Sequence, residues 1–451
     1  MHCLKSFLLA GAAGLLALAA AAADNFEVAG LKINHANGLY KKGEEIVVTG
    51  TLLHGGKPDP QYKLRAVTKW ENKVVASPTF PCDGKPFTIK YTSDKPGWAY
   101  FYFQVIGPDG KPVSEPVQKP IQRIKKTVAA EIGAMVAPEE LTYPQERPAD
   151  FDEFWQNELA KLAKVPLEPV VTKIDCNVKG IDLYTVSVPA GVDMPVTGYL
   201  AIPTGAKAKS LPAYQTFLSG WVGDANRNEA ISVARQGAIA LITTWHGWEV
   251  NHQPRQWYLD HVKTDLRKGA DNRETFYYRN MYVRALRAAQ FLQSRPEWNG
   301  RDYIVNGGSL AGSQAAIVAA YIPGVTIACI HTPSLCGYSS DLIPGRKRSL
   351  PFCNWKDAQV TPAIRAAAAY HDVVHMAARI KCEVYFTTAF ADEVCTPSNV
   401  FTGYNNLPKE NTKKFMTTNP RTGHYGTTPD VRGNKRRADF FRSYKRKYLS
   451  K

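Results

Sequence analysis

From Asp150 to the C-terminus, strand-like and helix-like segments alternate, and this alternation constrains the fold more than any other feature of the 451-residue chain. Short apolar runs typical of strands are separated by longer segments whose apolar residues have helical spacing. Chains that repeat strand, helix and strand build a mostly parallel sheet with helices on both faces. Residues 150–451 are therefore predicted to form an α/β domain. Its strand-like runs are IDLYTVSV, VTGYLAIP, AYQTFL, AIALITTW, DYIV, VTIACIH, CEVYFTTAF and KKFMTT.

Residues 24–120 have a different pattern, in which short β-rich runs are separated by turn signals. The runs are EEIVVTGTLL, YKLRAVTKW, KPFTIKYTS and GWAYFYFQVIG, and the turns include HGGKPD and SDKPG. This spacing predicts a small, Ig-like β-sandwich. Within it, Trp98, Tyr100 and Tyr102 alternate along one strand face, which fits either glycan binding or core burial. Residues 121–149 are rich in proline and charge and are predicted to be a linker and entry segment.

The first 23 residues have the composition of a secretory signal peptide. Lys5 supplies the positive charge, residues 7–20 form an apolar run, and residues 21–23 are the small alanines that signal peptidase needs. The apolar run is short for a membrane span, and no later segment is long and apolar enough to be one. We therefore expect cleavage after Ala23, export to the periplasm or the exterior, and no integral membrane span.

Charge and cysteine content refine this expectation. The chain has 56 Lys and Arg against 40 Asp and Glu, a net charge of +16 that becomes (56 − 1) − 40 = +15 once Lys5 is removed. A basic exported protein favours anionic polymers as partners, and export argues against nucleic acid. Seven of the eight cysteines follow Ala23, so at least one thiol stays unpaired within the chain. The sequence has no CxxC pair, so a structural zinc site is not expected.

The stretch NGGSLAGSQAA, residues 306–316, places Ser309 between a strand-like run and a small-residue segment that reads as a helix. A serine hydroxyl becomes a nucleophile when a base, an orienting carboxylate and oxyanion donors surround it. A sharp strand-to-helix turn needs small residues two before and two after the serine, and these are Gly307 and Ala311. Taken alone, the stretch leaves open whether Ser309 is a nucleophile or a serine in a small-residue loop.

Candidate partners follow Ser309 in the order Ser, Asp, His that α/β-hydrolases use. Asp392 comes just after the run CEVYFTTAF, and His424 comes just after KKFMTT. The carboxyl ends of parallel strands share one edge of a sheet, so these side chains are expected near Ser309. His331 is a rival base, although its strand is the next one over. The oxyanion donors are expected to be the N–H of Leu310 and an N–H after AYQTFL, from Gly220 or Trp221.

Residues 371–375, HDVVH, are similar to the zinc motif H-E-x-x-H. His371 and His375 could share a metal ion on one face of a helix. Aspartate is one methylene shorter than the glutamate that serves as the base in that motif, and no third ligand is evident. A structural role for both histidines is the favoured interpretation.

These segments together resemble the acetyl xylan esterase and cephalosporin C deacetylase family, carbohydrate esterase family seven, which has the α/β-hydrolase fold. The resemblance runs from about Val136 to the C-terminus and is carried by RPADFDEFW, FYYRNMYVRALRAAQFL and AAYHDVVHMAARIKCEVYFTTAFADEVCTPSNVFTGYNNL. It implies Ser309 as nucleophile, Asp392 as orienting acid and His424 as base. It also implies the backbone N–H groups of Trp221 and Leu310 as oxyanion donors, with no metal and no organic cofactor.

The chain departs from the family pattern at several positions. It has G-G-S-L-A-G where the family usually has Gly-x-Ser-Gln-Gly-Gly, Ser219-Gly220-Trp221 in place of His-Gly-Tyr, TWHGWE in place of Asp-x-Arg-Gly-Gln-Gly, and Arg284 at a usually acidic position. None of these changes removes a side chain that the chemistry needs.

The resemblance implies an exported serine esterase that removes acetyl groups from acetylated oligo- or polysaccharides, acidic ones included, and it allows a homo-oligomer because the family usually forms hexamers. Two alternatives stay open at this point: a glycan-binding protein with an inactive esterase domain, and a serine peptidase of the same fold.

Overall fold

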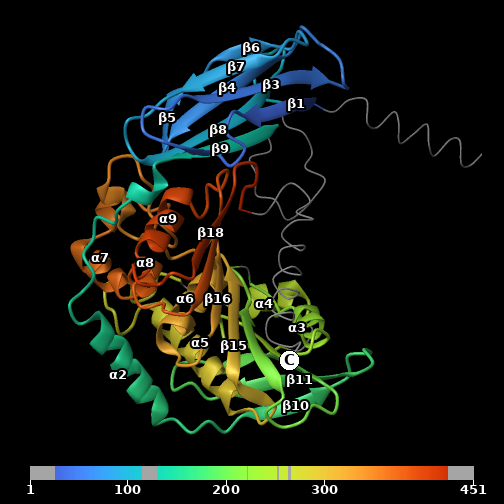
Figure 1. Ribbon diagram of the computed structural model, residues 1–451, viewed down its shortest axis with the longest axis vertical. Helices are drawn as coiled ribbons and strands as arrows, with labels where there is room; N and C mark the ends of the chain where they lie inside the picture. The colour runs from blue at the N-terminus through green and yellow to red at the C-terminus, as the bar shows by residue number, and fades with distance from the viewer. Residues whose placement is uncertain (1–25, 114–128, 221, 251–252, 263–265, 425–451) are drawn as a thin grey trace, which may run out of the picture. The chain divides into compact units, whose positions relative to one another are not determined.

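The computed structural model describes residues 26–113, 129–220, 222–250, 253–262 and 266–424 (Figure 1). The contacts divide these residues into two compact units. The sandwich unit holds residues 26–113, 129–140, 389–392 and 418–424, and the hydrolase unit holds the other described residues. The predicted signal peptide, residues 1–23, lies outside the described residues. In the described part of the chain, no helix combines the length and the apolar character that crossing a membrane requires.

The sandwich unit contains two sheets that are mainly antiparallel, as the β-rich pattern predicts. Alternate residues of their strands, such as Val48, Leu64 and Phe101, point into one shared core. The first sheet has the order β1 (Phe26–Ile33), β3 (Ile46–His54), β7 (Phe87–Tyr91). The second has the order β2 (Leu39–Tyr40), β9 (Ala130–Val136), β8 (Gly97–Ile106), β4 (Lys63–Trp70), β5 (Lys73–Ala76), and β6 (Thr79–Pro81) pairs with β4.

The expected linker over 121–149 needs a correction, because part of it belongs to the sandwich. Residues 130–136 form β9, which pairs antiparallel with β8 from Phe103 opposite Ala130 to Gly97 opposite Val136. The strand is short and stands between two proline- and charge-rich stretches, whose composition hides it in the sequence. The β-rich region therefore continues past residue 120, and the 3-10 turn η1 (Pro138–Glu140) follows it.

The hydrolase unit is built on a nine-stranded mixed sheet. Its centre is parallel, with β14, β13, β15, β16 and β17 pairing in that order, whereas β10, β11 and β12 pair antiparallel at one edge. The full order is β10 (Val170–Ile174), β11 (Ile181–Val188), β12 (Val196–Pro203), β14 (Ile239–Thr243), β13 (Leu211–Phe217), β15 (Trp298–Gly308), β16 (Ile327–His331), β17 (Glu383–Ala389), β18 (Lys414–Asn419).

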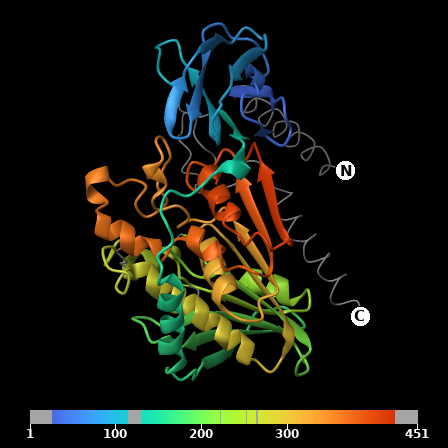
Figure 2. The ribbon, with the colours of Figure 1, turned by 60° about the vertical axis from the view of Figure 1, so that its left-hand side comes forward.

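Helices cover both faces of this sheet, because successive residues of the buried strands point in opposite directions. On β13, Ala213 packs in the larger core with α2, α5 and α6, whereas Tyr214 packs in a second core with α3. Figures 1 and 2 show α2, α5 and α6 gathered on one side of the strands. The helices are α2 (Phe151–Ala163), α3 (Arg227–Ala234), α4 (Arg255–His261), α5 (Tyr277–Ser294), α6 (Leu310–Tyr321), α7 (Pro362–Ala369), α8 (Val373–Ala377) and α9 (Pro397–Asn405), with 3-10 turns η2 (Ser340–Leu342) and η3 (Asp357–Gln359).

Candidate active site

Ser309 occupies the turn between β15 and α6, as the small-residue pattern predicts. Its backbone has φ 54° and ψ −123°, a conformation that a residue with a side chain adopts only under constraint. Two hydrogen bonds hold it there, since the Ser309 N–H donates to the His331 carbonyl (2.9 Å) and the Ser334 N–H donates to the Ser309 carbonyl (3.0 Å). The residue is only half-buried, whereas the strand behind it is buried. This geometry matches the sharp turn that presents a nucleophilic serine at the end of a sheet.

The turn requires glycine two residues before the serine. A Cβ atom at Gly307 would stand 2.1 Å from the carbonyl oxygen of Ala311, a distance that no real Cβ tolerates. A Cβ at the neighbouring Gly308 would meet nothing closer than 3.6 Å. The small residue at 307 is therefore explained by the closeness of strand and helix, as expected from the sequence.

The loop that was expected to supply an oxyanion donor is joined to this turn by a hydrogen bond. Ser219 donates its hydroxyl to the carbonyl of Gly308 (3.1 Å), and a Cβ at Gly220 would lie 3.6 Å from the Cβ of Leu310. Leu310 begins α6, so its N–H is in the first turn, where amides have no partner one turn earlier in the helix. Trp221, the other expected donor, lies outside the described residues. The sequence predicts an oxyanion donor in this segment but gives no sign of the hydrogen bond from the Ser219 hydroxyl to Gly308.

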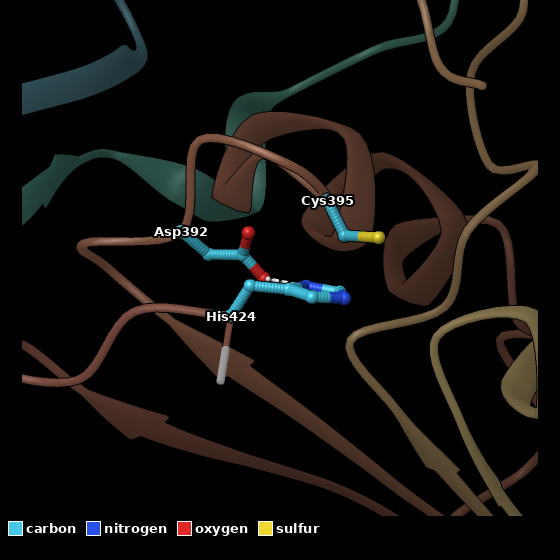
Figure 3. A group of neighbouring side chains, drawn as sticks. All are labelled: Asp392, Cys395 and His424. Atoms are coloured by element: carbon cyan, nitrogen blue, oxygen red, sulfur yellow. Dashed lines mark hydrogen bonds and ion pairs between the residues drawn. The ribbon is translucent and has the colours of Figure 1, made fainter. Parts of the chain in front are cut away.

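Asp392 and His424 form a hydrogen-bonded pair (Figure 3). The Nδ1 atom of His424 lies 2.8 Å from Oδ2 of Asp392; the Asp392 side chain is fully buried and that of His424 is 9% exposed. A buried carboxylate at Nδ1 fixes the tautomer in which Nε2 can accept a proton. Asp392 and His424 belong to the sandwich unit and Ser309 to the hydrolase unit.

The loops that carry this pair are joined to each other. The N–H of Phe390 donates to the Asn419 carbonyl (2.8 Å), and the N–H of Ala391 donates to the Thr422 carbonyl (3.1 Å). Both bonds connect the segment before Asp392 with the segment before His424. The side-chain contact is thus supported by two backbone hydrogen bonds between the segments that precede it.

His331, the rival base, is held by other side chains. Its Nε2 lies 3.0 Å from Oδ1 of Asn306, and its Nδ1 lies 3.1 Å from the hydroxyl of Thr387. Both ring nitrogens therefore have partners on the adjacent strands β15 and β17. This arrangement fits a role in linking three strands below the turn.

The HDVVH segment is not one helix, which corrects the expectation of a helix carrying both histidines. Helix α7 ends at Ala369, and Asp372 caps α8 by accepting the N–H of Val374 (2.9 Å). The same carboxylate accepts the N–H groups of Gly337 and Tyr338, which makes it a structural hub. His371 and His375 are buried, and burial lowers the pKa of His371 to about 3. In the described ranges, neither histidine belongs to a group of three possible metal ligands.

One group of three possible metal ligands does occur among the described residues. The ligand atoms of Asp392, Cys395 and His424 lie within 4.8 Å of one another, and Figure 3 shows Cys395 on the turn that follows Asp392. Two ligands of a tetrahedral zinc ion stand about 3.3 Å apart when each bond is about 2.0 Å. The 2.8 Å separation of Nδ1 and Oδ2 is instead that of a hydrogen bond. The geometry of these two side chains is therefore that of a hydrogen-bonded carboxylate and imidazole.

Comparison with known proteins completes the description of the site. Residues 139–430 match the acetyl xylan esterase (AXE1) family. This chain belongs to that family. The acetyl esterase Axe7A of Xylanibacter ruminicola is 27% identical over 405 residues, which are 84% of this chain and 83% of the relative. As a member of the acetyl xylan esterase family, the protein is a carboxylic ester hydrolase of the acetylesterase type.

Solved structures agree on the α/β-hydrolase fold. The acetyl xylan esterase from Paenibacillus sp. R4 is 24% identical, with a TM-score of 0.57 over 68% of this chain and 98% of that one. Acetyl xylan esterase 1 from Thermoanaerobacterium sp. JW/SL YS485 is 21% identical, with a TM-score of 0.56 over 67% of this chain and 96% of that one. The predicted fold, an α/β-hydrolase preceded by an all-β region, is confirmed.

Proposed function

We propose that this acetyl xylan esterase family member is an exported serine esterase that removes O-acetyl groups from acetylated oligo- or polysaccharides. The observation that carries the proposal is the constrained backbone of Ser309, at φ 54° between a parallel strand and a buried helix. Such a conformation costs about 1–3 kcal/mol and persists mainly where function needs it. Other residues outside glycine also have positive φ, but Ser309 has it directly between the end of β15 and the start of α6, where a nucleophilic serine of this fold is expected.

The chemistry follows the Ser-His-Asp mechanism. The Nε2 atom of His424 takes the hydroxyl proton of Ser309 while the Ser309 oxygen forms a bond to the acetyl carbonyl carbon. The carbonyl oxygen becomes an oxyanion, which the N–H groups of Leu310 and Trp221 stabilise. The intermediate collapses when the carbon–oxygen bond to the sugar breaks, and His424 gives its proton to the sugar oxygen.

The second half of the reaction releases acetate. His424 removes a proton from water, whose oxygen attacks the acetyl-serine carbonyl, and the proton then returns to Ser309 as its bond to the acetyl group breaks. Asp392 stabilises the imidazolium that forms twice in each cycle. The hydrogen-bonded pair at 2.8 Å supports these roles, because it holds the imidazole ready before substrate binds.

Export and substrate charge complete the proposal. Residues 1–23 have the composition of a signal peptide, and the chain beyond them carries a net charge of +15, from 55 Lys and Arg against 40 Asp and Glu. A basic esterase outside the cytoplasm attracts acidic acetylated glycans by long-range electrostatics, an effect that added salt weakens.

Acetate release from a panel of acetylated neutral and acidic glycans tests the proposal. The wild type should release acetate, and Ser309→Ala should release none above background. Ser232→Ala changes an exposed residue of α3 and should release acetate at the wild-type rate. A chelator should leave activity unchanged. Full activity of Ser309→Ala would refute the proposal, tight glycan binding without hydrolysis would indicate a binding protein, and cleavage of peptides alone would indicate a peptidase.

A further inference from the structure

The outer face of β8 carries a buried aromatic ladder that the sandwich core does not use. Trp98 stacks on Tyr100, with ring centroids 5.2 Å apart, and Tyr102 follows on the same face. The intervening residues Ala99 and Phe101 point into the sandwich core. Trp98 and Tyr100 are each only 2% exposed although they face away from that core. Two of the contacts that bury them come from the sandwich unit itself, through Phe390 and Glu131.

The cover over Trp98 includes the segment that leads to Asp392. The Trp98 indole Nε1–H donates to the carbonyl of Phe390 at 2.7 Å, two residues before Asp392. A Cβ atom at Gly133 of β9 would stand 1.9 Å from that same carbonyl oxygen. Only a glycine on β9 lets the Phe390 carbonyl come this close, so β9 and the segment before Asp392 are in direct contact.

The segment that leads to His424 rests on the same face. The N–H of Gly133 donates to the carbonyl of Pro420 at 2.8 Å. A Cβ atom at Gly423, the residue before His424, would stand 2.7 Å from Oε1 of Glu131. The other carboxylate oxygen of Glu131 accepts the hydroxyl of Tyr100 at 2.7 Å. Two neighbouring strands thus contact the chain directly before each member of the Asp392–His424 pair.

We propose that this face of the β-sandwich positions the acid–base pair of the esterase, with Trp98 and Tyr100 as positioning residues that act through Phe390 and Glu131. The inference rests on the proposed function, since it assigns a role to the partners of His424. A hydrogen-bonded carboxylate and imidazole must be held within a fraction of an ångström to work, and misplacement by about 1 Å can cost about 100-fold in rate. On this proposal Trp98 and Tyr100 are used for positioning and are not available as a glycan-binding surface, because both are only 2% exposed.

Trp98→Phe tests the inference, because it keeps an aromatic ring and removes the bond to Phe390. We expect kcat to fall about 10-fold or more, with KM changed less than 2-fold. The pH midpoint of kcat/KM should also move to lower pH, because a longer contact with Asp392 stabilises the protonated imidazole less. Trp298→Phe is the matched control, since the Trp298 indole donates to the Asp302 carbonyl (3.1 Å) at the other end of β15 from Ser309.

Tyr100→Phe provides a second, milder variant in case Trp98→Phe does not fold. It removes the hydroxyl that holds Glu131 and should lower kcat about 3-fold or more with the same direction of pH shift. Tyr62→Phe, whose ring packs on Phe26 in the same unit, should leave kcat and the pH profile unchanged.

Unchanged kcat and pH profile in both test variants, with Ser309→Ala inactive, would overturn the positioning role and leave the proposed function intact. Losses of kcat that come without a pH shift, or that the controls share, would also overturn it, because they indicate general destabilisation. Activity in Ser309→Ala would instead refute the proposed function itself.

Discussion

The imidazole of His424 and the carboxylate of Asp392 are joined through Nδ1 and Oδ2 at 2.8 Å, and the carboxylate is fully buried. A buried carboxylate needs a partner that compensates for its lost hydration, and the ring N–H supplies it. The bond also decides which nitrogen of the ring is free to act as a base.

Asp392→Asn should lower kcat by about 10³–10⁴-fold while KM changes less than about 3-fold. The amide keeps the shape but favours the wrong tautomer and cannot stabilise an imidazolium. Steady-state hydrolysis of an acetyl ester measures the change. Asp182→Asn is the control, since Asp182 pairs with the exposed Lys173 at the sheet edge, and it should match the wild type. Retention of more than a tenth of wild-type kcat by Asp392→Asn would argue against this role.

Substitution of the two candidate bases should affect hydrolysis to very different extents. His424→Gln should abolish measurable hydrolysis, whereas His331→Gln should lose less than about 10-fold, because the His331 ring is engaged by Asn306 and Thr387. The comparison of kcat/KM for the two variants, made at the same pH, decides between them. A larger loss in His331→Gln would reverse the assignment of the base.

The glycine before the turn should be irreplaceable. Gly307→Ala forces a Cβ to within 2.1 Å of the Ala311 carbonyl, so β15 and α6 must separate. We expect at least a 100-fold loss of kcat and a loss of stability of about 1–3 kcal/mol. Gly308→Ala, whose Cβ has 3.6 Å of room, should lose much less of both, as measured by kinetics and denaturant unfolding. Equal losses would show that crowding at 307 is not the cause.

Buried histidines should make the protein less stable in acid. Burial lowers the pKa of His246 from 6.5 to about 4, an effect that the nearby charge of Arg284 reinforces. Between about pH 6.5 and pH 4 the unfolded chain binds the proton that the folded chain refuses, so stability falls as the pH drops through this window. Across this window the free energy of unfolding of His246→Asn should fall less than that of the wild type, by on the order of 3 kcal/mol. Unfolding in urea at pH 7, 5.5 and 4.5 measures it, and parallel curves for both proteins would contradict the assignment.

The sequence was informative where one local pattern determines the structure. Alternating strands and helices predicted the α/β sheet, and Gly307 and Ala311 predicted the turn at Ser309, because each depends on residues close together in the chain. The sequence does not indicate strand β9, because this strand is stabilised by its hydrogen bonds to β8. It predicts one helix over HDVVH, because only the structure shows that Asp372 caps a new helix.

Contacts between residues far apart in the chain could not be predicted from the sequence. The bond from Trp98 to Phe390 joins residues 292 positions apart, and nothing in the composition of either segment indicates the other. The alternation of Trp98, Tyr100 and Tyr102 fitted either a glycan surface or burial. The structure shows the first two buried, outside the sandwich core and against the loops of Asp392 and His424.

Mass spectrometry of the protein after reaction with diethyl 4-nitrophenyl phosphate, which traps a serine activated by histidine, shows directly whether Ser309 is the nucleophile and His424 its base. We expect one diethylphosphoryl group, mapped to Ser309, that forms at least about 1,000-fold more slowly in His424→Gln. An adduct on another residue, or equal rates in the wild type and His424→Gln, would contradict it.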